Sequence, residues 1–298
     1  MSNAYESDFK RRVQVSGPTR FIPGTSIEVI REVRLARPPR FALLDFDGTL
    51  SLIREGWQAI MIPMMVELLL ETRSGEPADA LAGIVRNFVY ELTGKQTIYQ
   101  MIRLAEEIRK RNGRVREPLE YKRMYHERLM ARIHDRREAL RSGKAAPESM
   151  LVPGSLALLR ELQARGVRMF LASGTDERYV FEEARLLQLG PFFGEYIYGA
   201  QDDHALFSKQ MVIDRILKEN KVPGASLLGF GDGYVEIDNV RSSSGTAVGV
   251  ASDEAGRSGR PDEWKRERLI GAGADFIVPD FREAARLLAY LWDGKAEA

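Results

Sequence analysis

The feature that most constrains the fold is a change of hydrophobic period along the chain. Between residues 55 and 142, apolar residues recur at three- and four-residue spacing, with no convincing strand pattern. After a linker at 142–154, short apolar runs alternate with amphipathic helical segments. Such alternation is typical of a parallel sheet with helices on both faces. We therefore predict an α/β fold with an all-helical block inserted after its first core strand.

The periods and the Gly, Pro and Asn breaks predict individual elements. Helices are expected at 56–72, 78–93, 96–111, 117–141, 155–165, 176–188, 208–219 and 281–292. Strands are expected at 27–35, 41–45, 167–172, 196–199, 226–230, 246–251 and 275–278. Apart from the strand at 246–251, the Gly- and Ser-rich segment 241–261 is expected to be a long loop.

Composition excludes some classes of function. The 298 residues hold 44 Lys and Arg against 43 Asp and Glu, a net charge of +1, which gives no support to nucleic-acid or membrane-surface binding. The absence of Cys excludes disulfides, a thiol nucleophile and a thiolate metal site. No signal peptide is visible, and Pro63 and Glu67 interrupt the longest apolar stretch, 59–70. A cytoplasmic location is therefore the default expectation.

Two carboxylates end the predicted strand at 41–45. The run Phe-Ala-Leu-Leu stops at Asp45, and Asp47 follows within Asp-Phe-Asp-Gly-Thr. Ligands of open α/β sheets bind beyond the carboxyl ends of strands, and two acids beside a turn-forming Gly48 suit a divalent metal and an anion. An ordinary Asp-Gly turn explains one acid and the glycine, but not the second acid inside the apolar run.

Three later strand ends carry groups that complement these acids. Ser173 precedes a predicted helix, where a hydroxyl and free N–H groups suit phosphate, although for this residue taken alone simple N-capping is the plainer explanation. Lys209 lies at the start of the next predicted helix, where the helix dipole disfavours a positive charge. This position indicates that Lys209 faces a bound anion or a carboxylate cluster, although a solvated lysine is the plainer alternative. Asp232 and Glu236 lie among glycines after strand 226–230, a composition expected at a hard-cation site.

Taken together, these motifs resemble the haloacid dehalogenase-like (HAD) superfamily. Motif I is Asp45-Phe46-Asp47-Gly48-Thr49, motif II is Ser173, motif III is Lys209, and motif IV is Gly231-Asp232-Gly233 with Glu236. The resemblance implies a Rossmann-like core with a central parallel sheet and an inserted, C1-type helical cap domain. Its expected bounds are an N-terminal extension at 1–40, a core at 41–54 and 151–298, and a cap at 55–150. Motif IV departs from the commoner pattern because Glu236 stands where a second Asp is usual.

The resemblance also implies roles. Asp45 would be the nucleophile that forms an aspartyl-phosphate, and Asp47 would be the general acid and base. Asp45, Asp232 and the backbone carbonyl of Asp47 would hold Mg²⁺, with Glu236 near the metal or Lys209, which would neutralise Asp45 and the phosphoryl oxygens. The groups expected to donate hydrogen bonds to those oxygens are Ser173, Gly48, Thr49 and Gly174.

The implied activity is a Mg²⁺-dependent phosphatase acting on a small phosphorylated metabolite, with a sugar phosphate as the guess by analogy. Arg54 and Trp57, just past motif I, are candidates for contact with the leaving group, as are Lys95, Gln96 and Gln100. For each of them, solvation or packing is the plainer alternative. A phosphomutase or phosphotransferase would use the same motifs, and a non-catalytic binding module is a third hypothesis. The oligomeric state and the role of residues 1–40 do not follow from the sequence.

Overall fold

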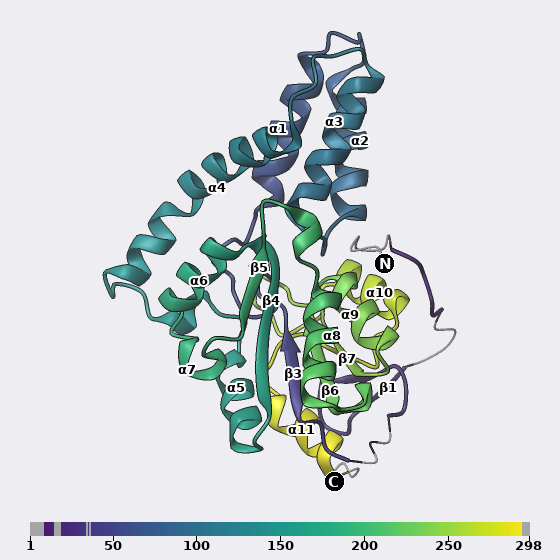
Figure 1. Ribbon diagram of the computed structural model, residues 1–298, viewed down its shortest axis with the longest axis vertical. Coiled ribbons are helices and arrows are strands. Elements are labelled where there is room, and N and C mark those ends of the chain that lie inside the picture. Colours follow the sequence, from purple (N-terminus) through teal and green to yellow (C-terminus); the bar gives the residue numbers. More distant parts are fainter. Residues whose placement is uncertain (1–8, 15–18, 34, 36, 294–298) are drawn as a thin grey trace.

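The computed structural model describes residues 9–14, 19–33, 35 and 37–293. Parts of the expected N-terminal extension and of the expected strand at 27–35 lie outside them: residues 1–8, 15–18, 34 and 36. Figure 1 shows an α/β body and a group of helices that projects from it. This group lies at the carboxyl ends of the strands.

One eight-stranded sheet organises the body, in the order β1-β2-β8-β7-β6-β3-β4-β5. Its parallel strands are β3 (Phe41–Leu44), β4 (Arg168–Asp176), β5 (Ile197–Ala200), β6 (Leu227–Gly231), β7 (Thr246–Val250) and β8 (Phe276–Val278). Two short antiparallel strands, β1 (Arg20–Phe21) and β2 (Glu28–Val29), extend one edge. Strand β3 lies between β4 and β6, so the order of the strands reverses at β3. In open α/β sheets, ligands bind in the crevice at the carboxyl end of such a topological switch point.

Helices cover both faces of the sheet (Figure 1). The body contains α5 (Ser155–Ala164), α6 (Glu177–Leu186), α7 (Gly190–Phe193), α8 (Lys209–Asn220), α9 (Tyr234–Ser242), α10 (Glu263–Ala272) and α11 (Ala284–Asp293). Along β3, Ala42 and Leu44 pack in one apolar cluster with α5 and α11, while Phe41 and Leu43 pack in another with α8, α9 and α10. This two-sided burial, which at about 1.5–3 kcal/mol per large apolar side chain is the main source of stability, fixes where β3 ends.

Four helices lie between β3 and α5 in the chain: α1 (Gln58–Leu70), α2 (Ala78–Glu91), α3 (Thr97–Lys110) and α4 (Pro118–Arg141). They form the projecting group of Figure 1, here called the cap. The α/β fold with a helical insertion predicted from the sequence is therefore confirmed. No described helix is long and apolar enough to cross a membrane.

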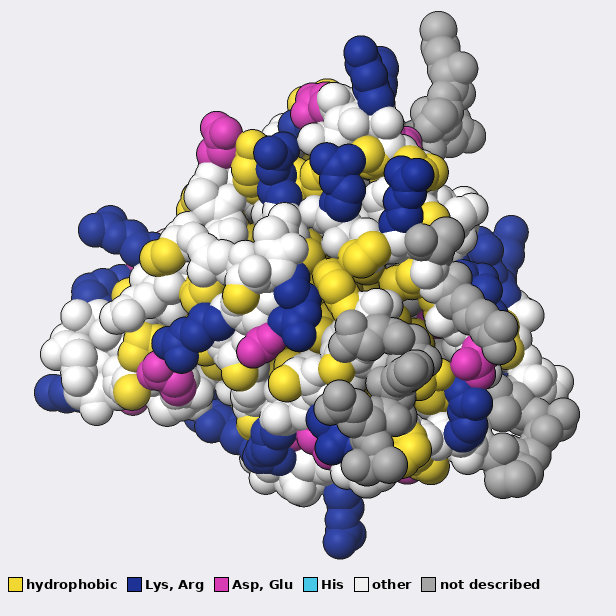
Figure 2. All heavy atoms as spheres, turned by 90° about the horizontal axis from the view of Figure 1, so that it is seen from below, with side chains coloured by type: hydrophobic (Ala, Val, Ile, Leu, Met, Phe, Trp, Pro, Cys, Tyr) yellow, Lys and Arg dark blue, Asp and Glu magenta, His cyan; other side chains and the backbone are white. Residues whose placement is uncertain are grey.

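Figure 2 views the end of the molecule opposite the cap. Lys and Arg side chains are spread around this face, between apolar side chains, and do not gather into one stripe.

Two sequence predictions were wrong in extent. Of the described residues in the expected strand 27–35, only Glu28–Val29 join the sheet, because the next two N–H groups, of Ile30 and Arg31, both donate to the carbonyl of Asp275 and bend the chain away. The sequence analysis did not predict helices α9 and α10. Helix α10 follows the expected loop 241–261. In α9 the apolar residues are closely spaced among charges, and in α10 polar residues dominate, so neither gives a clear period.

Candidate active site

The carboxyl ends of β3 and β6 bring Asp45 and motif IV together around Lys209. Lys209 Nζ lies 2.9 Å from Asp45 Oδ1 and 2.7 Å from Glu236 Oε2, and all three side chains are buried. Burial, with the negative charge of Glu236, raises the pKa of Asp45. Burial alone would lower the pKa of Lys209, but Asp45 and Glu236 raise it, so the ammonium stays charged.

Asp45, Asp232 and Glu236 form a group that fits a hard divalent cation. One carboxylate oxygen of each lies within 4.8 Å of the others. Oxygen donors with this negative charge are what Mg²⁺ prefers in proteins. Asp47 contributes no side-chain oxygen to the group, so any contact of Asp47 with a metal would use its backbone carbonyl, as the family resemblance implies.

Glycine makes the metal group possible at two points. Gly48 has φ +74°, and a Cβ there would lie 2.1 Å from Asp232 Oδ2, so only glycine lets the motif I turn meet Asp232. A Cβ at Gly231 would lie 2.0 Å from Glu236 Cγ. The longer Glu at this position is therefore accommodated beside a residue without a side chain, where its Oε1 accepts from the Gly233 N–H at 2.8 Å.

Asp47 faces a separate set of groups. Its Oδ2 accepts a hydrogen bond from Thr175 Oγ1 at 2.8 Å, and its Oδ1 lies 3.8 Å from Arg54 Nε. Burial is the main cause that raises the pKa of Asp47 to about 6, with Glu183 adding to it and Arg54 opposing it. Among the described residues, Asp47 Oδ1 has no hydrogen-bond partner. A carboxyl group of this kind can exist as an acid near neutral pH and carry a proton to a bound molecule.

Arg54 is held by a residue that sequence reasoning missed. Its guanidinium makes a two-pronged ion pair with Glu183 of α6, at 2.9 Å from Nε to Oε2 and from Nη2 to Oε1. Both side chains are buried, and Arg54 Nη1 also lies 3.4 Å from Thr175 Oγ1. These contacts occupy much of the guanidinium, so a substrate contact of Arg54 would have to use the N–H groups that Glu183 does not bind. Glu183 was recognisable only as an acid on the apolar face of α6, beside Val180 and Ala184.

The expected phosphate donors divide into two groups. Ser173 and Gly174 are at the end of β4 and line the cavity beside Asp45. Gly48 and Thr49 are not among the lining residues, and their backbone N–H groups donate to the carbonyls of Ser51 and Phe46 within the motif I turn. The Thr49 hydroxyl accepts from the Asp232 N–H at 2.9 Å. In this structure Gly48 and Thr49 therefore shape the motif I turn, and a phosphate contact from either stays a prediction.

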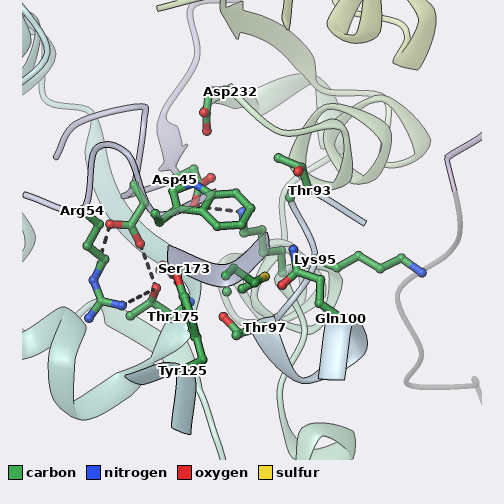
Figure 3. A pocket seen from close by; sticks show the side chains of 16 residues that line it. Asp45, Arg54, Thr93, Lys95, Thr97, Gln100, Tyr125, Ser173, Thr175 and Asp232 are labelled. Carbon is green, nitrogen blue, oxygen red and sulfur yellow. Dashed lines mark hydrogen bonds and ion pairs between the residues drawn. The ribbon is translucent and has the colours of Figure 1, made fainter. Parts of the chain in front are cut away.

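These groups open into one cavity of about 100 Å³ between core and cap (Figure 3). The core supplies Asp45, Asp47, Ser173, Gly174, Thr175, Lys209 and Asp232. The cap and the segments leading into it supply Arg54, Trp57, Met61, Thr93, Gly94, Lys95, Thr97, Gln100 and Tyr125. Of the cap residues that the sequence suggested, Gln96 is not in the lining and instead donates from Nε2 to the carbonyl of Phe207 at 2.8 Å.

The connection between α2 and α3 closes this cavity against the core. A Cβ at Gly233 would lie 2.7 Å from Gly94 Cα, and a Cβ at Gly174 would lie 3.0 Å from the Lys95 carbonyl oxygen. Backbone therefore packs on backbone at both places. The described structure is a closed arrangement of cap and core.

The comparisons with known proteins identify the family and the fold of the chain. A family model described as haloacid dehalogenase-like hydrolase matches residues 40–238. No curated protein matches the chain. Many solved structures share the fold. One is a haloacid dehalogenase-like protein of unknown function from Agrobacterium tumefaciens, with 17% identity, a TM-score of 0.54, and 85% of this chain and 99% of that chain covered.

Two further similar structures have activities in their descriptions. A predicted phosphoglycolate phosphatase from Haemophilus somnus is 16% identical, with a TM-score of 0.52, and 84% of this chain and 97% of that chain are covered. A β-phosphoglucomutase from Clostridium difficile is 14% identical, with a TM-score of 0.51, and 82% and 92% are covered. At these identities the likeness establishes the fold alone. Because the family model spans more than half of the sequence and includes all four motifs, the chain belongs to the haloacid dehalogenase-like hydrolases.

Proposed function

We propose that this protein is a Mg²⁺-dependent phosphatase that hydrolyses a small phosphorylated metabolite through a phosphorylated Asp45. The observation that carries the proposal is Asp47. It is a half-buried acid with a pKa of about 6 in the same cavity as the lysine-paired Asp45. An alkoxide leaving from phosphorus needs a proton, whereas a halide does not, so an acid at this position favours ester cleavage.

In the first step, an Asp45 carboxylate oxygen attacks phosphorus in line with the ester oxygen. The bond from phosphorus to that oxygen breaks, and the leaving oxygen takes the proton of Asp47. In the second step, Asp47, now a carboxylate, accepts a proton from a water molecule whose oxygen attacks the same phosphorus. The acyl-phosphate bond breaks, which releases inorganic phosphate and restores Asp45 and protonated Asp47.

Positive charge must offset the repulsion between Asp45 and the phosphoryl group. Lys209, at 2.9 Å from Asp45, is placed to contact both, while the Ser173 hydroxyl and the Gly174 N–H would donate to phosphoryl oxygens. Asp45, Asp232 and Glu236, together with the Asp47 carbonyl, would hold Mg²⁺. When bound, the ion would supply charge neutralisation and orientation of the phosphoryl group.

The shape of the cavity limits the leaving group. A volume of about 100 Å³ under a closed cap suits a small molecule and not a phosphorylated protein side chain. Trp57 and Tyr125 contribute aromatic rings to the lining. Thr97 and Gln100, labelled in Figure 3, contribute a hydroxyl and an amide group. A small phosphorylated polyol or sugar, with C–H faces and hydroxyl groups, matches this lining best.

The test is phosphate release from a panel of phosphorylated metabolites, with Mg²⁺ or with EDTA. Wild type is compared with Asp45→Asn and with a matched control, Asp135→Asn, at an exposed position of α4. Release that requires Mg²⁺, disappears in Asp45→Asn and persists in Asp135→Asn supports the proposal. Isomerised product without free phosphate would identify a mutase instead, and Mg²⁺ binding without any turnover would favour a binding module.

A further inference from the structure

A second buried lysine contacts the metal group, and the proposed mechanism gives it no role. Lys265 lies in the first turn of α10, where a positive charge opposes the helix dipole. Its Nζ lies 2.8 Å from Asp232 Oδ2, 2.7 Å from Glu254 Oε1 and 3.1 Å from Ser252 Oγ. These three acceptors use all three N–H donors of the ammonium group.

The contact with Asp232 places a permanent positive charge beside a metal ligand. Burial alone would lower the pKa of Lys265, but Asp232 and Glu254 raise it, so the group stays protonated. A cation bound by Asp45, Asp232 and Glu236 would be repelled by this ammonium and would draw on the same Asp232 carboxylate. The lysine and a metal therefore compete for one side chain.

The structure also offers the ammonium an alternative position. A cavity of about 450 Å³ lies next to the site, and both Lys265 and Glu254 line it. Three more acids, Glu55, Asp253 and Asp262, line the same cavity. The flexible four-carbon stem of lysine lets Nζ shift from Asp232 toward Glu254 and this acidic space without movement of α10.

We propose that Lys265 and Glu254 set the affinity of the site for Mg²⁺, with Lys265 competing for Asp232 Oδ2 and Glu254 receiving the ammonium when the ion binds. Both act as positioning residues. In the metal-free protein, Lys265 supplies part of the countercharge that holds the carboxylates together. The inference rests on the Mg²⁺ site of the proposed function.

The test is titration of metal-free protein with MgCl₂ in a calorimeter, which reads binding without turnover. Lys265→Met should bind Mg²⁺ at least about tenfold more tightly, because the competing charge is gone. Glu254→Gln should bind it about tenfold more weakly, because the ammonium then pairs with Asp232 alone. A merely structural role would weaken binding in both variants, so the opposite directions are diagnostic.

Two controls match these changes. Asp253→Asn removes the same charge as Glu254→Gln from the wall of the same cavity, at a residue whose carboxylate accepts from the Gly256 and Ser258 N–H groups. Lys218→Met removes an exposed lysine from the far end of α8. Each should change the Mg²⁺ affinity less than about twofold, because a screened charge without a direct contact has little effect.

The outcomes separate this inference from the proposed function. Wild type that binds no Mg²⁺ overturns both. Wild type that binds Mg²⁺, with a Lys265→Met variant that is folded by thermal unfolding in EDTA but binds equally or more weakly, overturns the inference alone. If Lys265→Met does not fold, Glu254→Gln decides, and an unchanged or tighter affinity in that variant overturns the inference.

Discussion

The two halves of the active-site cavity are built in different ways. The core half consists of charged groups at strand ends, Asp45, Asp47 and Asp232 with Lys209, each fixed by buried partners. The cap half consists mainly of rings, hydroxyls and an amide carried by helices and their connections. Groups that make and break bonds need a rigid setting, whereas groups that select a substrate need to be replaceable. The contrast assigns catalysis to the core and selection to the cap.

The largest expected effect removes the nucleophile from the core half. Asp45→Asn should lower kcat at least about 10⁴-fold, because covalent catalysis has no substitute carboxylate at this place. Phosphate release under saturating Mg²⁺ and substrate measures it. A variant that retains more than about a tenth of the wild-type rate would remove the basis for an aspartyl-phosphate.

Next in size is the loss of the acid. Asp47→Asn should lower kcat by about 10²–10⁴-fold, while Mg²⁺ affinity changes little, because Asp47 contributes no side-chain oxygen to the metal group. Calorimetric titration with Mg²⁺ beside the rate assay separates the two effects. A large loss of Mg²⁺ affinity with normal chemistry at saturating metal would show that the side chain serves the metal instead.

The pH dependence of the wild-type rate tests the same acid without a mutation. Asp47 must be protonated to donate, and its pKa is about 6, so kcat/KM should fall as the pH rises above about 6. In Asp47→Asn the group has no proton to lose, so that descending limb should vanish from the residual activity. If the limb persists unchanged in the variant, another group produces it.

The ion pair of Arg54 and Glu183, at the boundary between the two halves, should contribute to the free energy of unfolding. Arg54→Met leaves Glu183 buried without its partner and should lower the free energy of unfolding by about 3–5 kcal/mol. The double variant Arg54→Met with Glu183→Leu should recover most of the loss, because the uncompensated charge is then gone. Urea unfolding of the single and double variants measures this, and a single-variant loss below about 1 kcal/mol would contradict the importance of the pair.

The smallest effect is expected in the cap half. Gln100→Ala and Thr97→Val should change KM for the best substrate by up to about tenfold and reorder the panel, while kcat changes less than about threefold. Steady-state kinetics on the full panel checks this. Equal losses of kcat for every substrate would place these side chains in the chemistry and erase the contrast between the halves.

Sequence alone was informative about the core half and much less so about the cap half. Strand periods place Asp45, Ser173 and Asp232 at one edge of a parallel sheet, so their meeting follows from local patterns. The partnership of Arg54 with Glu183 does not, since the two are 129 positions apart and nothing local marks the pair. Lys265 was missed for the same reason, because its acceptors come from two other segments, one with Asp232 and one with Ser252 and Glu254.

Local patterns also failed where tertiary contacts decide the backbone. The strand expected at 27–35 has the right residues but is bent by two hydrogen bonds to the Asp275 carbonyl. Thr49 shows the same dependence, because its hydroxyl accepts from the N–H of Asp232, which is 183 positions away. Both outcomes depend on groups far away in the sequence.

The contact of Gly94 with Gly233 has a consequence for how such a protein can diversify. The seal between cap and core is made there by main chain on main chain, so it places no demand on the side chains around it. Thr97, Gln100 and Trp57 can change in evolution or in the laboratory while the enclosure persists. New substrates can then be acquired by single replacements, provided that these two glycines stay glycine.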